Sequence, residues 1–311
     1  MTAAFAAAFA PSQGRQLMAF TLGLIQLQAN SIDVDHLDLA MAAVRAAARA
    51  GAQICILPEL FRSPYFCQDM DPRHFDRAEA VPGVTTDRLA GLASELQIVI
   101  IASLFELAAP GLYYNTTAVL DADGTYLGKY RKTHIPNDPQ YEEKFYFTPG
   151  DNDFKVFQTK YARVGVLICW DQWFAEAARL TSMHGAEVLV YPTAIGTIDG
   201  EPADEQARQI DAWQTVQRGH AIANGVYVAA VNRVGREPGP NGGIDFWGRS
   251  FCAGPQGEIL ASASEHKAHT LLIECSAERI RDVRNMWPFF RDRRVDLYQG
   301  LQRRFFDDTT K

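Results

Sequence analysis

Hydrophobic and polar positions follow two alternating periods along this chain from residue 19 onward. Short apolar runs bounded by turn residues alternate with longer segments in which apolar residues recur every three or four positions. The short runs predict buried strands at 19–27, 53–57, 97–104, 162–169, 186–191, 226–232 and 268–275. The longer segments predict helices at 33–50, 84–96, 173–184 and 203–224. This order predicts one α/β domain with covered sheets.

Turn and cap residues add two hairpins to this outline. Strands at 113–121 and 125–131 are expected to turn at Asp123-Gly124, and a second hairpin within 246–261 to turn at Pro255-Gln256-Gly257. Asp33 is the expected N-cap of the first helix. No linker, repeat or low-complexity tract follows residue 18, so 18–311 is expected to form a single domain.

The N-terminal segment 1–17 has a different character. It is rich in Ala and Phe and lacks a basic start, which makes it a poor signal peptide. We expect it to be a flexible extension.

Charge and cysteine usage exclude several classes of protein. The 311 residues carry a net charge of −7 with no basic run, so no nucleic-acid partner is expected. No apolar stretch approaches the ~18 residues of a membrane span. The five cysteines are scattered without a CxxC, and the seven histidines show no metal-ligand spacing. We therefore expect no metal, no cofactor and a reducing, cytoplasmic setting.

Cys169 is the candidate for chemistry. It ends the apolar run 164–168 and precedes a predicted helix, an arrangement that presents a nucleophile. A thiol titrates near ~8.5 and needs a base or a nearby cation. Glu59, which follows the strand at 53–57, could accept the thiol proton, and Lys132 could stabilise both the thiolate and an oxyanion. From residue types alone, the alternatives are a buried filler cysteine, a turn glutamate and a solvated lysine.

Three motifs in order favour the catalytic roles over these alternatives: LPE at 57–59, YRKTHIP at 130–136 and GVLICWD at 165–171. They resemble the nitrilase superfamily of carbon–nitrogen hydrolases. The resemblance covers roughly 19–300 and continues through 143–151, 185–187, 191–196, 232–235 and 290–294.

The resemblance implies an α-β-β-α sandwich that pairs into a four-layered dimer, often within larger assemblies. It implies a triad of Glu59, Lys132 and Cys169, with Glu143 orienting the lysine and the substrate. The backbone N–H of Trp170 would be the second oxyanion donor. Ala175 departs from the proline that relatives often carry, which should alter the helix entry alone.

Two residues within these motifs have less specific roles. His134 is expected to be structural. Asp171 fits a helix N-cap and a functional carboxylate equally well.

Within the superfamily, segments 66–68, 144–147, 169–174 and 191–196 most closely resemble the N-carbamoylputrescine amidases. The expected reaction is cleavage of a terminal ureido group through a cysteine thioester, giving the amine, ammonia and CO2. Relatives that cleave carbamoyl amino acids carry an arginine just after the cysteine, where this chain has Gln172 and Trp173. Candidate substrate contacts are Tyr65, Phe66, Gln172, Trp173 and Thr193.

The loop 199–205 carries four acids in seven residues, which suits a cationic substrate tail or a solvated helix start. Two other functions stay open. One is a β-ureidopropionase-like or aliphatic amidase, and the other is a non-catalytic scaffold. The apolar tail 287–290 predicts an interface in a homo-oligomer.

Overall fold

The structure is a computed structural model that describes residues 19–28 and 35–306. The predicted extension 1–17 and the predicted cap Asp33 lie outside these residues. The first helix, α1 (His36–Arg49), begins after Asp35, whose side chain accepts hydrogen bonds from the backbone nitrogens of Leu37 and Asp38.

The first sheet has six strands in the order β15-β1-β2-β3-β4-β5. The three central strands, β1, β2 and β3, run parallel, and β15, β4 and β5 add antiparallel edges. Their bounds are β1 (Ala19–Gln26), β2 (Ile54–Ile56), β3 (Val99–Ala109), β4 (Leu112–Leu120), β5 (Tyr126–Arg131) and β15 (His269–Ser276).

The second sheet repeats this plan in the order β14-β13-β10-β8-β7-β6. Its parallel centre is formed by β10, β8 and β7. The bounds are β6 (Val156–Gln158), β7 (Arg163–Val166), β8 (Val188–Pro192), β10 (Tyr227–Val231), β13 (Phe251–Ala253) and β14 (Ile259–Ser262).

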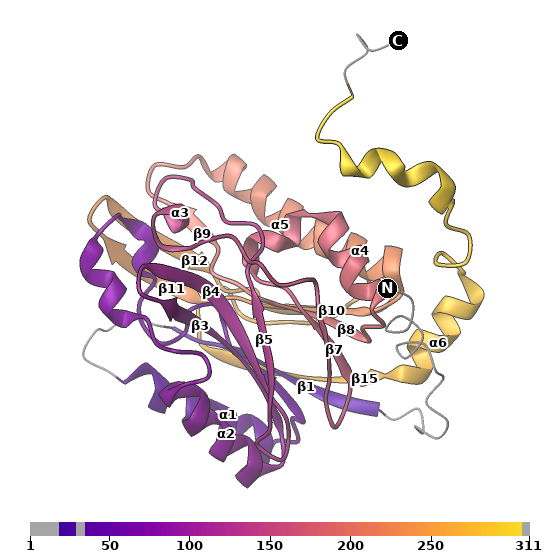
Figure 1. The fold of residues 1–311 in the computed structure, drawn as a ribbon, viewed down its shortest axis with the longest axis horizontal. Coiled ribbons are helices and arrows are strands. Elements are labelled where there is room, and N and C mark those ends of the chain that lie inside the picture. Colours follow the sequence, from indigo (N-terminus) through magenta and orange to yellow (C-terminus); the bar gives the residue numbers. More distant parts are fainter. Residues whose placement is uncertain (1–18, 29–34, 307–311) are drawn as a thin grey trace.

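The two sheets pack face to face between two pairs of helices. Figure 1 shows α1 and α2 (Val84–Leu96) on one outer face and α4 (Ala175–Met183) with α5 (Ala203–Asn224) on the other. One buried cluster joins the sheets through residues such as Leu22, Ile54 and Val188, and a second packs α1 and α2 against the first sheet. This confirms the predicted α-β-β-α sandwich in a single domain.

The remaining elements are short. A third sheet, in the order β11-β12-β9, joins β9 (Gly196–Ile198), β11 (Val234–Gly239) and β12 (Gly242–Trp247). The short helices are η2 (Phe66–Gln68), η3 (Pro72–Arg77), α3 (Glu143–Tyr146) and η4 (Cys169–Trp173). After β15 come α6 (Ala277–Met286) and η5 (Val295–Gln302). No described helix is both long and apolar enough to cross a membrane.

Two predicted elements differ from the structure near the site. The strand expected at 162–169 ends at Val166, and the helix expected from 173 begins at Ala175. Between them lies the η4 turn, which begins at Cys169. The predicted hairpin at 246–261 is also shorter, because residues up to Trp247 belong to β12 of the third sheet.

Candidate active site

The carboxyl ends of parallel strands from both sheets meet at one edge of the sandwich. Glu59 follows β2, Cys169 follows β7, and Ala194 follows β8. Lys132 follows β5 directly, with its backbone N–H bonded to the carbonyl of Asn115 on β4. Because strand ends fix the backbone, side chains just beyond them converge on one place.

Lys132 is the centre of a buried polar cluster. Its Nζ donates to Glu59 Oε1 at 2.8 Å and to Glu143 Oε2 at 2.6 Å, and all three side chains are at most 1% exposed. Burial alone would lower the pKa of Lys132, but the carboxylates of Glu143 and Glu59 raise it well above its ordinary value. The lysine therefore stays a cation.

Glu143 reaches the cluster from the short helix α3. It accepts a second hydrogen bond from the hydroxyl of Tyr65 at 2.8 Å. Burial raises its pKa to about 7, Lys132 opposes this shift, and Glu59 adds to it.

The two carboxylate oxygens of Glu59 differ in their hydrogen bonding. Oε1 accepts from Lys132 and from Asn115 Nδ2 at 2.7 Å, whereas the buried Oε2 has no hydrogen-bond partner. The backbone of this segment is fixed by Arg233, which donates to the carbonyls of Glu59 and Leu60. Arg233 is itself paired with the buried Glu237 at 2.7 Å. A buried carboxylate oxygen without a partner is suited to accept a proton.

Cys169 is held in an uncommon backbone conformation. Its φ of 40° lies in the left-handed region, and the side chain is 5% exposed. Burial raises the pKa of its thiol well above the ordinary value, the charge of Glu59 raises it further, and Lys132 acts in the opposite direction. Its Sγ lies 3.8 Å from the carbonyl oxygen of Ala194.

Asp171 cross-links the turn that carries Cys169. One oxygen accepts from the backbone of Ile168 at 3.0 Å and from Tyr130 Oη at 2.8 Å. The other accepts from the backbone of His134 at 3.0 Å and lies 2.7 Å from His134 Nδ1. Asp171 is therefore not an N-cap: it occupies the third position of η4 and reaches back to Ile168. His134 also stacks on Phe174, with ring centroids 3.6 Å apart.

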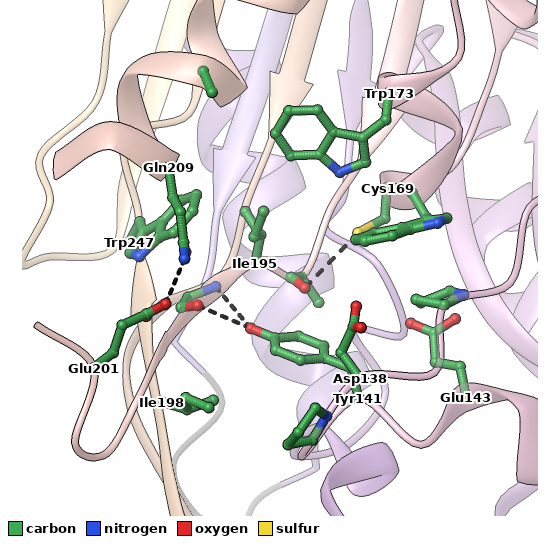
Figure 2. Close-up of a pocket in the computed structure, with 16 residues that line it drawn as sticks. Asp138, Tyr141, Glu143, Cys169, Trp173, Ile195, Ile198, Glu201, Gln209 and Trp247 are labelled. Atoms are coloured by element: carbon green, nitrogen blue, oxygen red, sulfur yellow. Dashed lines mark hydrogen bonds between the residues drawn. The ribbon is translucent and has the colours of Figure 1, made fainter. Parts of the chain in front are cut away.

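A pocket of about 360 Å³ opens above this cluster. Figure 2 shows Cys169 and Glu143 at one end, Tyr141 and Trp173 along the sides, and Glu201, Gln209 and Trp247 at the other end. Its lining also includes Pro136, Asp138, Pro139, Trp170, Ala194, Ile195, Gly196, Ile198 and Ala212. The lining is mostly apolar and holds three carboxylates.

The structure thus brings together Glu59, Lys132, Glu143, Trp170 and Cys169. Among the predicted substrate contacts, only Trp173 lines the pocket. Gln172 is buried and turned toward α5, where its Oε1 accepts from Trp213 Nε1 at 2.9 Å.

The other three contacts are also directed elsewhere. The Tyr65 hydroxyl donates to Glu143, Phe66 stacks on Phe105 in an aromatic cluster, and Thr193 Oγ1 donates to the carbonyl of Tyr191. None of these four side chains is therefore in position to contact a substrate that fills the pocket.

Several residues that support or line the site were not predicted from the sequence. Asn115 lies on β4, within the strand predicted at 113–121, so a polar residue in need of a partner was a signal available there, whereas Glu237 lies on β11, which was not predicted. Asp138, Tyr141 and Gln209 come from loops and a helix face, and nothing in their local sequence indicates a pocket.

One group of described side chains, Asp69, Asp71 and His74, has metal-ligand spacing. None of these residues lines the pocket, and Asp71 is already paired with Arg73.

The arrangement can support nucleophilic chemistry. A thiol lies beside a carboxylate with an unoccupied oxygen and a buried ammonium, at the end of an apolar pocket that limits water. A lysine ammonium has three protons, of which two are donated to carboxylates here, so one remains for a substrate oxygen.

Comparisons with known proteins agree with this geometry. The carbon–nitrogen hydrolase family model matches residues 21–285. The N-carbamoylputrescine amidase of Solanum lycopersicum is 50% identical over 83% of this chain and 86% of its own. The citrullinase of Francisella tularensis is 40% identical over 91% of this chain and 98% of its own. The crystal structure of a carbon–nitrogen hydrolase from Helicobacter pylori superimposes with a TM-score of 0.89 at 42% identity, over 93% of this chain and all of that one. This chain belongs to the carbon–nitrogen hydrolase family of the nitrilase superfamily.

Proposed function

We propose that this enzyme hydrolyses the terminal ureido group of N-carbamoylputrescine to putrescine, ammonia and CO2. The observation that carries the proposal is the cluster of Glu59, Lys132 and Cys169 at the end of a pocket, in a chain half identical to a plant enzyme of that name. The substrate is a small cation, which agrees with the excess of carboxylates in the pocket lining.

The first half of the mechanism forms a covalent intermediate. Glu59 Oε2 takes the thiol proton as Cys169 Sγ attacks the ureido carbon. The oxyanion is stabilised by Lys132 Nζ and the backbone N–H of Trp170. Glu59 then returns the proton to the terminal nitrogen, which leaves as ammonia and gives an S-carbamoyl thioester on Cys169.

The second half releases the product. Ammonia leaves space for a water molecule, which Glu59 deprotonates as the water attacks the thioester. The tetrahedral intermediate collapses, the thiol regains its proton from Glu59, and a carbamic acid departs. That acid decomposes to putrescine and CO2. Glu59 thus alternates between base and acid, while Glu143 holds Lys132 in place.

A panel of substrates tests the proposal. Purified protein is assayed for ammonia release from N-carbamoylputrescine, citrulline, N-carbamoyl-β-alanine and a simple aliphatic amide. We expect the highest kcat/KM with N-carbamoylputrescine. Gln172 and Trp173, in place of an arginine, indicate a substrate without a carboxylate, so a preference for N-carbamoyl-β-alanine would contradict this interpretation. A lack of hydrolysis across the panel would favour the scaffold hypothesis.

A homo-oligomer is part of the same proposal. Residues 287–306 extend from the body of the protein (yellow in Figure 1), and their apolar side chains are largely exposed. Leu297 is 66% exposed, Leu301 65% and Phe305 83%. Exposed apolar patches of this kind mark interfaces. Light scattering should give a multiple of the monomer mass for the full chain and a smaller mass for Leu297→Asp/Leu301→Asp. Equal masses would contradict this part.

A cytoplasmic location also stays a proposal. All five cysteines are unpaired thiols, as expected for a protein of a reducing compartment.

A further inference from the structure

The end of the pocket opposite Cys169 is formed by the loop between β9 and α5 and by the first turns of α5. Figure 2 shows Glu201 there, across the pocket from Cys169 and Glu143. The nucleophile fixes where the reacting carbon of a substrate must lie. A substrate that fills the pocket therefore brings its far end to Glu201.

The side walls and the far end of the pocket offer apolar surface. Tyr141 Oη exchanges hydrogen bonds with both backbone groups of Gly196, at 2.9 and 3.1 Å. Trp247 Nε1 donates to Thr197 Oγ1 at 2.8 Å. Because these polar atoms are satisfied within the protein, the rings present their carbon faces to the pocket, as a methylene chain requires.

Glu201 is the polar group at the far end that remains available. Gln209 Nε2 donates to Oε1, and no described residue donates to Oε2. Across the described part of the chain, Glu201 forms no ion pair, whereas the neighbouring loop acid Asp199 is paired with Arg236 at 2.8 Å. The pocket lining contains no Lys, Arg or His among the described residues.

We propose that Glu201 is the specificity-determining residue that binds the terminal ammonium of the substrate, oriented by Gln209. This rests on the proposed function and deepens it: the preferred substrates are ω-ureido amines with an uncharged chain between the ureido group and the cation. A carboxylate at the far end excludes ureido acids, because two like charges would face each other in a mostly apolar pocket.

The test compares two substrates that differ only in charge. In n-pentylurea a methyl group replaces the ammonium of N-carbamoylputrescine, while the reacting group and the chain are unchanged. Three proteins are assayed: the wild type, Glu201→Gln and Asp204→Asn. The last removes an equal charge from an exposed position on the first turn of α5, where Asp204 pairs with Arg208 and does not line the pocket.

For Glu201→Gln we expect kcat/KM on N-carbamoylputrescine to fall about 10- to 100-fold, mainly through KM, as expected for loss of one charge-assisted hydrogen bond. Its kcat/KM on n-pentylurea should change less than about 3-fold, since that substrate makes no such bond. Asp204→Asn should match the wild type on both. Thermal unfolding checks that each variant is folded.

Two outcomes would overturn the inference alone: wild-type activity on N-carbamoylputrescine that is unchanged in Glu201→Gln, or an equal loss on both substrates. The second would show that Glu201 shapes the pocket without recognising charge. A wild type that hydrolyses n-pentylurea and not N-carbamoylputrescine would instead overturn the proposed function itself.

Discussion

Carboxylates occur both in the buried cluster around Lys132 (the inner cluster) and in the pocket that opens above it (the outer pocket). The two regions differ in whether those carboxylates are paired with a cation. In the inner cluster Glu59 and Glu143 are fully buried and share Lys132. In the outer pocket Asp138 is exposed and Glu201 partly exposed, and no ion pair forms at either among the residues described. The inner charges satisfy one another, whereas the outer ones are free for a ligand.

Because of this difference, residues that support catalysis and residues that select the substrate can change independently. Glu59 and Lys132 follow strands, Glu143 comes from α3, and all three are joined by buried ion pairs, so altering one leaves another charge unpaired. The outer residues come from loops and the start of α5, where a substitution costs little stability. We therefore expect inner variants to lose turnover or stability and outer variants to change substrate preference.

The largest expected effect is on turnover. Cys169→Ser replaces the thiol by a poorer nucleophile and should lower kcat at least about 10³-fold. Ammonia release measures it, with Cys55→Ala as the control because Cys55 is a buried thiol of β2 outside the pocket. Near-normal turnover by Cys169→Ser would refute the covalent mechanism.

The next effect concerns stability, and two arginines form a matched pair: Arg233, just before strand β11, and Arg236, within it. Arg233→Met leaves Glu237 buried without its partner and should lower the free energy of unfolding by about 3–5 kcal/mol. Arg236→Met removes exposed pairs with Asp199 and Asp245 and should cost about 0–1 kcal/mol. Urea denaturation measures both. Similar losses would show that burial does not determine the cost of losing an ion pair in this protein.

Two tyrosines allow a comparison of the inner cluster with the pocket wall by smaller changes. Tyr65→Phe removes a buried hydrogen bond to the Glu143 carboxylate, worth about 1.5–3 kcal/mol, and should lower kcat about 10-fold. Tyr141→Phe removes bonds to Gly196 in the pocket wall and should raise KM by about 2- to 5-fold with little change in kcat. Steady-state kinetics separate the two, and a kcat effect of equal size in both variants would argue against the division.

The last prediction concerns the pH dependence of stability. Burial raises the pKa of Glu143 from 4.5 to about 7, so between these values the folded protein binds more protons than the unfolded chain. The stability that protonated Glu143 contributes is present below about pH 4.5 and is lost as the pH rises through about 7. Glu143→Gln should lack this decline. Denaturation of both proteins between these pH values measures the slopes, and parallel slopes would contradict the shift.

Much of the fold could be predicted because the elements of the two large sheets carry clear periodicity. The third sheet was missed since β11 and β12 contain Pro238, Gly239, Gly242 and Gly243, residues that normally indicate turns. The strand before Cys169 was predicted three residues too long, because an apolar run continues past the last ladder pair.

The inner cluster could be predicted from its motifs, whereas the pocket could not. Glu59 and Lys132 follow predicted strands and Cys169 ends one, so their convergence follows from topology. Gln172 was placed in the pocket because it lies near Cys169 in sequence, but the η4 turn directs its side chain toward Trp213. Side-chain direction in an irregular turn depends on packing that adjacent sequence does not encode.

The buried state of the Cys169 thiol has a consequence for the lifetime of the enzyme. Oxidants attack the thiolate, and burial keeps this thiol protonated by raising its pKa. The resting enzyme should therefore resist peroxide inactivation, and slow alkylation of Cys169 would not identify an inactive protein. In the proposed mechanism its reactivity emerges when a substrate occupies the pocket and Glu59 removes the proton, so we expect the nucleophile to be durable between turnovers and exposed to damage only during them.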